Sequence, residues 1–348
     1  MKRYKQNPDF LHIGETLIQW YKNNARELPW RASQSPYHIW ISEIILQQTQ
    51  VAQGLPYYQR FIKRFPTVND LAEAPQDEVL LYWKGLGYYS RAINLQKAAQ
   101  QVVNDYKNEF PDTSKGLETL KGVGKYTSAA IASICFGEVI PAVDGNFYRV
   151  LSRFFGDSFD ISSSKSFVYF TELAYRIMPN HSPGEFNQAI MDLGANICTP
   201  KLAKCEDCPL QKDCVAYSVG DVYSFPVKIK KTKVEAQDLH YTLIRFEDYF
   251  LIQKRDNTSI WKNLYEIIPS ELISSKNLNS QEISVVKHKL SHRDLSIYFN
   301  EILLNSIEEL RKLAAEEGWN VVQYKQISEF SFPKPIDTFL QKQAKHFI

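Results

Sequence analysis

The 348-residue sequence has no uninterrupted apolar run near the roughly 18 residues that a membrane-spanning helix needs. Its first residues, MKRYKQNPDF, are basic but no apolar stretch follows them, which argues against a secretory signal peptide. Neither sign of charge dominates: 41 Lys and Arg stand against 39 Asp and Glu, a formal net charge of +2. We therefore expect a cytoplasmic protein without a membrane partner, and the near-neutral total still leaves room for a local basic groove.

Cysteine is scarce and unevenly placed. Of five cysteines, Cys135 stands alone in the apolar stretch AAIASICFG and is expected to be a small buried side chain. The other four, in the spacing Cys-x6-Cys-x2-Cys-x5-Cys, are Cys198, Cys205, Cys208 and Cys214. In a reducing compartment such a group indicates a metal site rather than disulfides. Only one close pair is present, which favours an iron–sulfur cluster, with zinc as the alternative.

The first two thirds of the chain have helical periodicity. FLHIGETLIQWYKNN (10–24) and YHIWISEIILQQTQV (37–51) each predict one helix, and DGNFYRVLSRFFG (144–156) has apolar residues at i, i+3, i+4 and i+7. PTVNDLAEAPQDEVLLYWKGLGYYSRAINLQKAAQQVVNDY (66–106) predicts helix, glycine hairpin, helix. We therefore expect an all-α domain over residues 1–225.

The pattern changes after residue 225. A lysine-rich stretch without apolar periodicity predicts a basic linker over 226–238. LHYTLIRFEDYFLIQKR predicts a β-hairpin about Glu247–Asp248, and DLSIYFNEILL predicts a further strand. SIEELRKLAAEEG predicts a helix capped by Ser306, with Glu309 in capping-box spacing and Gly318 at its end. A smaller α+β domain over 239–348 is expected.

A glycine hairpin stands in LKGVGKYTSAAIA (120–132). Glycine permits positive φ and close backbone approach, and free N–H groups at a helix start attract anions. Gly122, Val123 and Gly124 could thus hold a DNA phosphate through the backbone, or simply form a corner between two helices. The similar stretch WKGLGYYSRA (83–92) favours the phosphate interpretation.

Two carboxylates stand in unusual surroundings. Glu43 interrupts the apolar IWISEIIL, where it lies either on a solvated stripe or in an apolar site that raises its pKa. Asp144 precedes a predicted helix and so could be an N-cap or the edge of a pocket. If they meet, one protonated acid and one ionised carboxylate could cleave a glycosidic bond.

Several stretches together resemble the helix-hairpin-helix DNA glycosylases with an iron–sulfur cluster, and among them the MutY-type adenine glycosylases. Besides the glycine hairpin and the cysteines, they are LPWR (28–31), SEIILQQTQV (42–51), GLGYYSRA (85–92), AVDGNFYRVLSR (142–153) and FNQAIMDLGANICT (186–199). With the cysteine loop the resemblance spans residues 28–214. NTSIWKNLYEIIP and HKLSHRDLSIYF are similar, less strongly, to the family's Nudix-like domain.

The resemblance implies removal of adenine opposite 8-oxoguanine or guanine in double-stranded DNA, by a monomer, after the adenine is flipped out of the helix. Glu43 would protonate adenine N7 and later assist the attacking water. Asp144 would stabilise the oxocarbenium ion through a transient covalent adduct, with Tyr126 and Asn146 orienting both groups. A [4Fe-4S] cluster on the four clustered cysteines would order a DNA-binding loop.

The resemblance also implies contacts with the base and the lesion. The adenine pocket would be lined by Arg26, Trp30, Arg31, Gln188 and Met191. Near the lesion, Gln48 and Tyr88 would fill or wedge the base stack and Leu46 would press on its neighbours. Ser291 and His292 would contact the oxidised guanine.

The sequence departs from the family in three places. Leu290 stands before Ser291 where the family has phenylalanine, which puts the geometry of lesion recognition in doubt, and Lys121 stands where the hairpin often has proline. The glutamate-rich Nudix hydrolase box is not recognisable, so this domain is expected to bind a lesion and not to hydrolyse nucleotides.

Three other functions are weighed against this one. A lyase of the endonuclease III type would need a lysine where Tyr126 stands, and a helix step of about 100° would turn Lys125 away. A non-catalytic DNA-binding protein would keep the hairpins and the cluster without using Glu43. A regulatory module would bind zinc in place of iron.

Overall fold

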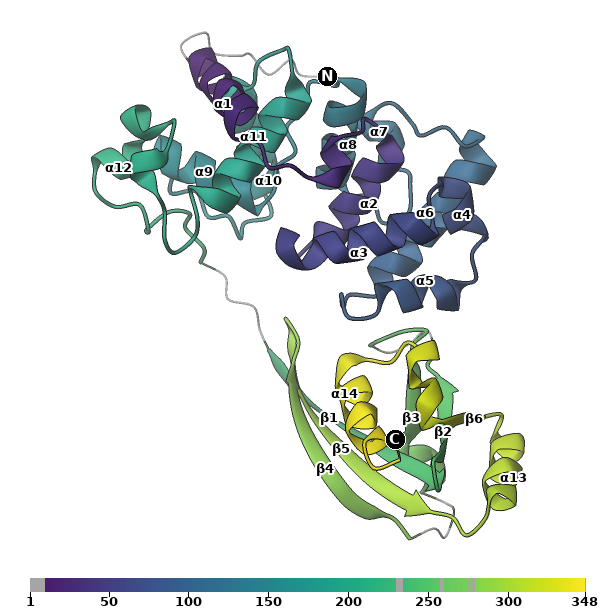
Figure 1. Ribbon diagram of the computed structural model, residues 1–348. Coiled ribbons are helices and arrows are strands. Elements are labelled where there is room, and N and C mark those ends of the chain that lie inside the picture. Colours follow the sequence, from purple (N-terminus) through teal and green to yellow (C-terminus); the bar gives the residue numbers. More distant parts are fainter. Residues whose placement is uncertain (1–9, 230–233, 257–259, 275, 277–278, 348) are drawn as a thin grey trace. The chain divides into compact units, whose positions relative to one another are not determined.

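The computed structural model describes residues 10–229, 234–256, 260–274, 276 and 279–347 (Figure 1). They fall into two compact units, the first from residues 1–72 and 97–231 and the second from 73–96 and 232–348. The first unit is helical and the second contains the sheet, as expected from the change of pattern near residue 225. The domain limits 1–225 and 239–348 stay a prediction. Among the described residues we find no helix with the length and apolarity that a membrane crossing requires.

The first unit is built from helices joined by short loops. Its longer helices are α1 (Leu11–Asn24), α2 (Pro36–Leu46), α3 (Val51–Arg64), α8 (Lys125–Phe136), α9 (Gly145–Phe155), α10 (Ser166–Ile177) and α11 (Pro183–Asn196). Its shorter segments are η2 (Pro29–Arg31), α4 (Val68–Glu73), α7 (Ser114–Leu117), η3 (Cys205–Asp207), η4 (Gln211–Asp213) and α12 (Val215–Ser218). The helix α6 (Ser90–Tyr106) begins in the second unit and ends in the first.

The expectation of a single helix over residues 37–51 is wrong, because two helices cover this range. The helix α2 ends at Leu46, and α3 starts afresh at Val51 after a turn in which Gln48 has φ 57°. A non-glycine residue in this left-handed region cannot continue a right-handed helix. The helix expected over 66–83 is likewise divided, because Pro75 precedes α5 (Gln76–Trp83) and separates it from α4.

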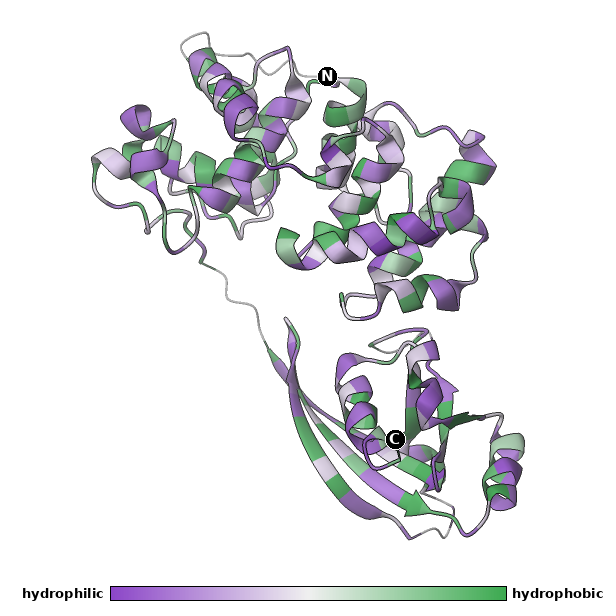
Figure 2. Cartoon of the chain, in the orientation of Figure 1, coloured by the Kyte–Doolittle hydropathy of each residue, from purple (hydrophilic) through white to green (hydrophobic). Residues whose placement is uncertain are grey.

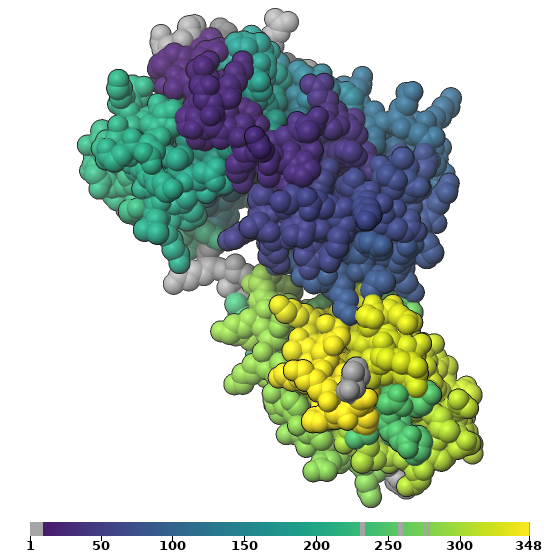
Figure 3. Space-filling model, in the orientation of Figure 1, coloured from purple at the N-terminus to yellow at the C-terminus, as the bar shows by residue number. Residues whose placement is uncertain are grey.

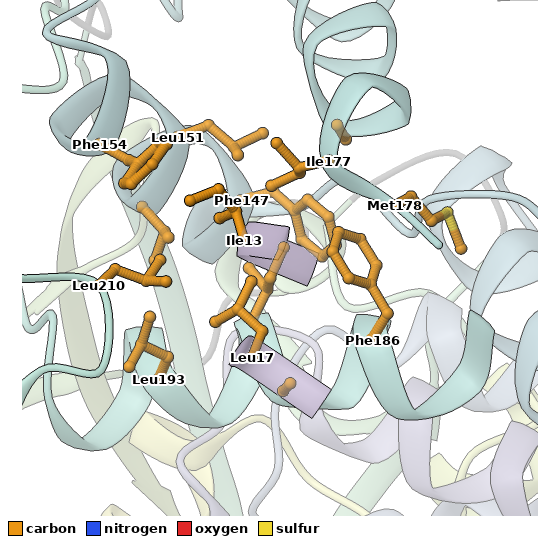
Figure 4. Packing of buried hydrophobic residues seen from close by; sticks show 14 of the residues in the cluster. Ile13, Leu17, Phe147, Leu151, Phe154, Ile177, Met178, Phe186, Leu193 and Leu210 are labelled. Atoms are coloured by element: carbon orange, nitrogen blue, oxygen red, sulfur yellow. The ribbon is translucent and has the colours of Figure 1, made fainter. Parts of the chain in front are cut away.

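One hydrophobic core of the first unit brings α1, near the start of the described residues, together with α9, α10 and α11 from the later part of that unit. The stripe of α9 predicted from its sequence, Phe147, Val150, Leu151 and Phe154, is buried against α1, α10 and α11 (Figure 4). Helix α1 lies along α11, and its purple surface adjoins teal atoms from the middle of the chain in Figure 3. Gly14 allows α1 to approach the end of α10, since a Cβ there would lie 2.1 Å from the Ile177 carbonyl oxygen. This core holds α9 and α11 beside each other.

The loops before α8 and α9 set where those helices begin. Gly122 has φ +78°, so the hairpin needs glycine at this position, whereas Gly124 is extended and is the N-cap of α8. Asp144 caps α9 by accepting hydrogen bonds from the N–H groups of Asn146 and Phe147, both at 2.9 Å. The cap interpretation of Asp144 is therefore correct.

The second unit contains a six-stranded sheet of order β4-β5-β1-β3-β2-β6. The pair β1–β5 is parallel and the other pairs are antiparallel. The strands are β1 (Glu235–Phe246), β2 (Tyr249–Lys254), β3 (Tyr265–Pro269), β4 (Gln281–Lys289), β5 (Arg293–Leu303) and β6 (Asn320–Gln323). The other elements are α5, η5 (Ser270–Ile273), α13 (Ile307–Glu317), η6 (Tyr324–Glu329) and α14 (Lys334–Ala344).

Both faces of the sheet are covered. Leu243, Phe250 and Ile267 pack in one cluster with α14, and their neighbours Ile244, Leu251 and Ile268 pack in another with α13. The side chains of successive residues in a strand point to opposite faces of the sheet. A strand that is buried on both faces therefore needs apolar residues at consecutive positions. Figure 2 shows hydrophobic segments interspersed with hydrophilic ones along the long strands.

Most expectations for this region are confirmed. The hairpin turns at Glu247–Asp248, β5 covers DLSIYFNEIL, and α13 is capped by Ser306 and ends at Gly318, which has φ +72°. The predicted linker is too long at its end, because β1 already begins at Glu235 and pairs with β5 from there. Residues 230–233 of that linker lie outside the described residues.

Candidate active site

The predicted catalytic and base-contacting side chains converge on one cavity of about 620 Å³ in the first unit. It is bordered by η2, α2, α3, α8, α9 and α11 together with the loops next to them. Its lining includes these sequence-predicted residues: Arg26, Trp30, Arg31, Glu43, Leu46, Tyr126, Asp144, Asn146, Gln188 and Met191. The sequence placed them up to 165 positions apart, and the packing of α2, α8, α9 and α11 brings them together.

A larger hollow of about 880 Å³ lies elsewhere in the first unit, lined by residues such as Tyr37, Phe110 and Phe136. Its two carboxylates, Glu109 and Asp112, are exposed. We place the candidate site in the smaller cavity because two half-buried carboxylates with raised pKa values, Glu43 and Asp144, converge there.

Glu43 reaches the cavity from the apolar helix α2. Burial raises its pKa to about 7, and the negative charge of Asp144 acts in the same direction. A hydrogen bond from Tyr126 Oη to Glu43 Oε2, 2.6 Å long, and the charge of Arg31 oppose the rise without cancelling it. A substantial fraction of Glu43 is therefore protonated at neutral pH, and Tyr126 engages one of its two oxygens.

Asp144 is held as a hydrogen-bond acceptor. Burial raises its pKa, but the N–H of Phe147, the side chain and N–H of Asn146, and the charge of Arg149 oppose that rise. Asn146 Nδ2 donates to Asp144 Oδ2 at 2.7 Å, in addition to the two backbone donors on Oδ1. The two carboxylates of the cavity thus lie in different environments, and the ionised form is favoured more strongly at Asp144 than at Glu43.

The side-chain amide of Asn146 is fixed by a hydrogen bond from Arg149. Arg149 Nη2 donates to Asn146 Oδ1 and to the Gly194 carbonyl, both at 2.7 Å. Because Asn146 Oδ1 accepts from Arg149, its Nδ2 points to Asp144. Gly194 must lack a side chain here, since a Cβ would lie 2.7 Å from both Cβ and Oδ1 of Asn146.

Two of the arginines that line the cavity, Arg26 and Arg31, share one buried carboxylate, Asp192. Arg26 donates to it through Nε at 2.8 Å and through Nη2, and Arg31 donates through Nη1 at 2.8 Å and Nη2 at 2.9 Å. Burial by itself would raise the pKa of Asp192, but its hydrogen bonds and the charges of both arginines lower it overall. Asp192 is fully buried, so this ionised group anchors both guanidinium groups.

A family model described as HhH-GPD superfamily base excision DNA repair protein matches residues 41–173. An adenine DNA glycosylase from Buchnera aphidicola (subsp. Schizaphis graminum) is 33% identical over 341 residues, which cover 94% of this chain and 98% of that protein. The chain belongs to the adenine DNA glycosylase family. It is accordingly a DNA glycosylase of base excision repair.

The family extends to eukaryotes. The adenine DNA glycosylase of Rattus norvegicus is 43% identical over 218 residues, covering 60% of this chain and 42% of that one. A solved thermostable thymine-DNA glycosylase is 32% identical with a TM-score of 0.54, over 60% of this chain and 96% of that chain. The chain shares its fold with an endonuclease III solved in a non-covalent complex with DNA. The two are 21% identical with a TM-score of 0.52, over 60% of this chain and 95% of that chain.

The candidate lyase nucleophile does not reach the site of this adenine glycosylase. Tyr126, the second residue of α8, lines the cavity, whereas its neighbour Lys125 is exposed and lies with Nζ 5.1 Å from the centre of the Phe167 ring. Lys125 does not belong to the described residues that line the cavity. Its position agrees with the turn expected from helix geometry.

The four clustered cysteines line one small hollow in the first unit of this adenine glycosylase, beside Arg153. Arg153 Nη1 lies 3.3 Å from Cys198 Sγ and also donates to the Thr199 carbonyl. Burial raises the pKa of Cys205, Cys208 and Cys214, so these three thiols are neutral when free. In the described part of the chain, no three Cys, His, Asp or Glu side chains are close enough to hold a single metal ion.

The predicted lesion contacts lie outside the cavity, except for Leu46. Gln48 and Tyr88 are both exposed and both have left-handed backbones, with φ 57° and 47°. Gly122 and Gly124 are exposed, while Val123 is buried. Non-glycine residues with positive φ are uncommon and cluster at ligand contacts.

Ser291 and His292 lie in the second unit, at the turn between β4 and β5. Both are exposed, and Ser291 Oγ lies 3.3 Å from His292 Nδ1. Leu290, at the position of the family's phenylalanine, is half-buried against the sheet core. The hydroxyl and the imidazole thus face outward at one hairpin tip.

Sequence reasoning missed Asp192, Arg149, Gly194 and Tyr21. A signal for two of them was present. Asp192 follows Gln188 by four residues and Arg149 follows Asn146 by three, spacings that place each on the helix face of a predicted site residue. Nothing in the sequence pairs Asp192 with Arg26 and Arg31, which lie more than 160 positions away.

Proposed function

We propose that this glycosylase hydrolyses the N-glycosidic bond of adenine paired with 8-oxoguanine, or with guanine, in double-stranded DNA. The observation that carries the proposal is the pair Glu43 and Asp144, two carboxylates of one cavity held in different protonation environments. Adenine must leave the helix to enter such a cavity. Its volume of about 620 Å³ is ample for one purine and a water molecule.

Glu43 acts as the general acid. In its protonated form it donates to N7 of adenine, which converts the base into a better leaving group. The hydrogen bond from Tyr126 holds Oε2 and leaves Oε1 to carry the proton toward the base. After the bond breaks, the Glu43 carboxylate accepts a proton from the attacking water.

Asp144 faces the positive charge that develops on the sugar. Three donors keep its carboxylate oriented, so little rearrangement is needed when the oxocarbenium ion forms. One of these donors is the side-chain amide of Asn146, and Arg149 keeps this amide in its orientation by donating to Asn146 Oδ1.

Recognition of the opposite base is assigned to the second unit, which we propose to be a Nudix-like lesion-binding domain. An 8-oxoguanine differs from guanine by an N7–H donor and an O8 acceptor. Ser291 and His292 supply one acceptor and one donor at an exposed hairpin tip. The backbone of Gly122, Val123 and Gly124 is assigned to a DNA phosphate, and Gln48 and Tyr88 to the base stack.

The test is single-turnover excision, followed by alkaline strand cleavage, on duplexes with adenine opposite 8-oxoguanine, guanine or thymine. We expect the fastest excision opposite 8-oxoguanine, slower excision opposite guanine and almost none opposite thymine. The double variant Ser291→Ala/His292→Ala should lower the preference for 8-oxoguanine over guanine by roughly tenfold or more, the loss of two hydrogen bonds. Ser274→Ala/His346→Ala, an exposed pair on the same unit, is the matched control. Equal rates on all three duplexes would refute the proposal.

We also assign a [4Fe-4S] cluster to Cys198, Cys205, Cys208 and Cys214. All four thiols line one hollow, and Arg153 places a donor at Cys198 Sγ, an interaction suited to a thiolate. The cluster would supply the positive charge that lets buried thiols ionise, and would order the loop around them.

Iron and acid-labile sulfide in the purified protein test this assignment. We expect about four of each per chain and a brown colour. Cys208→Ser should reduce both, whereas Cys135→Ser, at a cysteine that does not line the hollow, should change neither. Zinc in place of iron, in a colourless protein, would contradict the cluster.

A further inference from the structure

A buried tyrosine stands behind the wall of the cavity. Tyr21 on α1 donates its phenolic hydrogen to Gln188 Oε1 on α11 at 3.0 Å. Only 7% of Tyr21 is exposed, whereas Gln188 belongs to the cavity lining. The hydroxyl therefore acts on a residue of the cavity wall without lining the cavity itself.

The ring of Tyr21 is held in place. The Arg31 guanidinium lies over it, 5.3 Å from the ring centre, and Asp192 binds that guanidinium through two hydrogen bonds. Burial raises the pKa of Tyr21, so the phenol keeps its proton. If the amide were turned by half a turn, its Nε2 could donate to the phenolic oxygen, but the buried O–H of Tyr21 would lose Gln188 Oε1 as its acceptor. The cost of a buried donor without an acceptor therefore favours the oxygen end of the amide at Tyr21.

This contact sets how Gln188 faces a purine. An unconstrained amide can rotate by half a turn and exchange its donor and acceptor ends at almost no cost in shape. Adenine has a 6-amino donor and an acceptor at N1, and hypoxanthine has a 6-oxo acceptor and a donor at N1. The two bases have nearly the same shape with reversed patterns, so a fixed amide can distinguish them and a rotating amide cannot.

We propose that Tyr21 is a positioning residue that fixes the amide of Gln188 in one orientation and thereby contributes to the selection of adenine over 6-oxopurines. The inference rests on the proposed function, since it requires a flipped purine in this cavity. It adds a determinant of base specificity that never touches the base.

The test is a double-mutant cycle of Tyr21→Phe and Gln188→Met. Excision is measured under single turnover on duplexes with adenine or hypoxanthine opposite 8-oxoguanine. Tyr21→Phe should reduce the adenine-to-hypoxanthine rate ratio roughly five- to tenfold, the effect of about one hydrogen bond. In the Gln188→Met background the same change should have almost no effect on the ratio, because Tyr21 acts through Gln188.

Two measurements separate positioning from a structural role. The pH dependence of excision should be unchanged in Tyr21→Phe, since Glu43 is not altered. Tyr37→Phe is the matched control: Tyr37 is also buried and its hydroxyl donates to the Phe65 carbonyl, so the base ratio should stay as in the wild type. A Tyr21→Phe effect that persists fully with Gln188→Met, or an unchanged ratio in a folded Tyr21→Phe variant, would overturn the inference. Failure of the wild type to excise adenine would instead reject the proposed function.

Discussion

Glu43→Gln is expected to lower the rate of adenine excision by about 10²- to 10⁴-fold, the usual contribution of a general acid. The glutamine has almost the same size and still accepts the hydrogen bond from Tyr126, but it has no proton to give to the base. Binding to the duplex should be nearly unchanged. Single-turnover excision and fluorescence anisotropy on the same labelled duplex measure the two effects separately.

Glu109→Gln is the matched control for this experiment. It removes an exposed carboxylate of the first unit that lies in the other hollow, and its excision rate should equal that of the wild type. A Glu43→Gln variant that binds DNA and excises adenine within threefold of the wild type would remove Glu43 from the proton transfer.

The raised pKa of Glu43 gives the expected sign of the pH dependence. Because the protonated form is active, the rate should be highest below pH 7 and fall as the pH rises through about 7. The same shift affects folding: the pKa is higher in the folded chain, so the contribution of Glu43 to stability is lost as the pH rises toward that value. Glu43→Gln should therefore melt no lower than the wild type at pH 8.

Asp192→Asn is expected to lower the free energy of unfolding of the first unit by about 3–5 kcal/mol. The amide keeps the volume but carries no charge, so two guanidinium groups lose their shared partner. A unit of this size should then melt roughly 6–20 °C lower. Excision should fall as well, because Arg26 and Arg31 lose the anchor that holds them at the cavity.

The matched control is Asp213→Asn. Asp213 is exposed and lies 3.9 Å from His12, so its loss should change the free energy of unfolding by less than about 1 kcal/mol. Calorimetric scans of the wild type and both variants give the comparison. If Asp192→Asn and Asp213→Asn melt at the same temperature, the two arginines are held by something other than Asp192.

Local sequence patterns predict the structure correctly where a short range of residues is enough to determine it. The apolar stripe of α9, the caps Asp144 and Ser306, and the hairpin at Glu247–Asp248 depend on neighbours within about four residues. The break after α2 was missed because QQTQ contains neither glycine nor proline, and a positive φ at Gln48 has no marker in the sequence. The start of β1 at Glu235 was not predicted, because the lysine-rich sequence around it does not alternate between apolar and polar residues.

The groups available for the chemistry follow from the sequence: the motifs that carry Glu43, Asp144 and Tyr126, and four cysteines in compact spacing. It also excluded an amine at the position of Tyr126. These are properties of residue type and short spacing.

What those residues can do depends on how distant segments of the chain pack together. The packing of α2, α8, α9 and α11 buries Glu43 enough to raise its pKa to about 7, while a helix start gives Asp144 its donors. The packing of α1 on α11 brings Tyr21 to Gln188, and the fold brings Arg26 and Arg31 to Asp192. Burial and long-range hydrogen bonds set protonation and orientation, and neither quantity is a property of a residue and its neighbours in sequence.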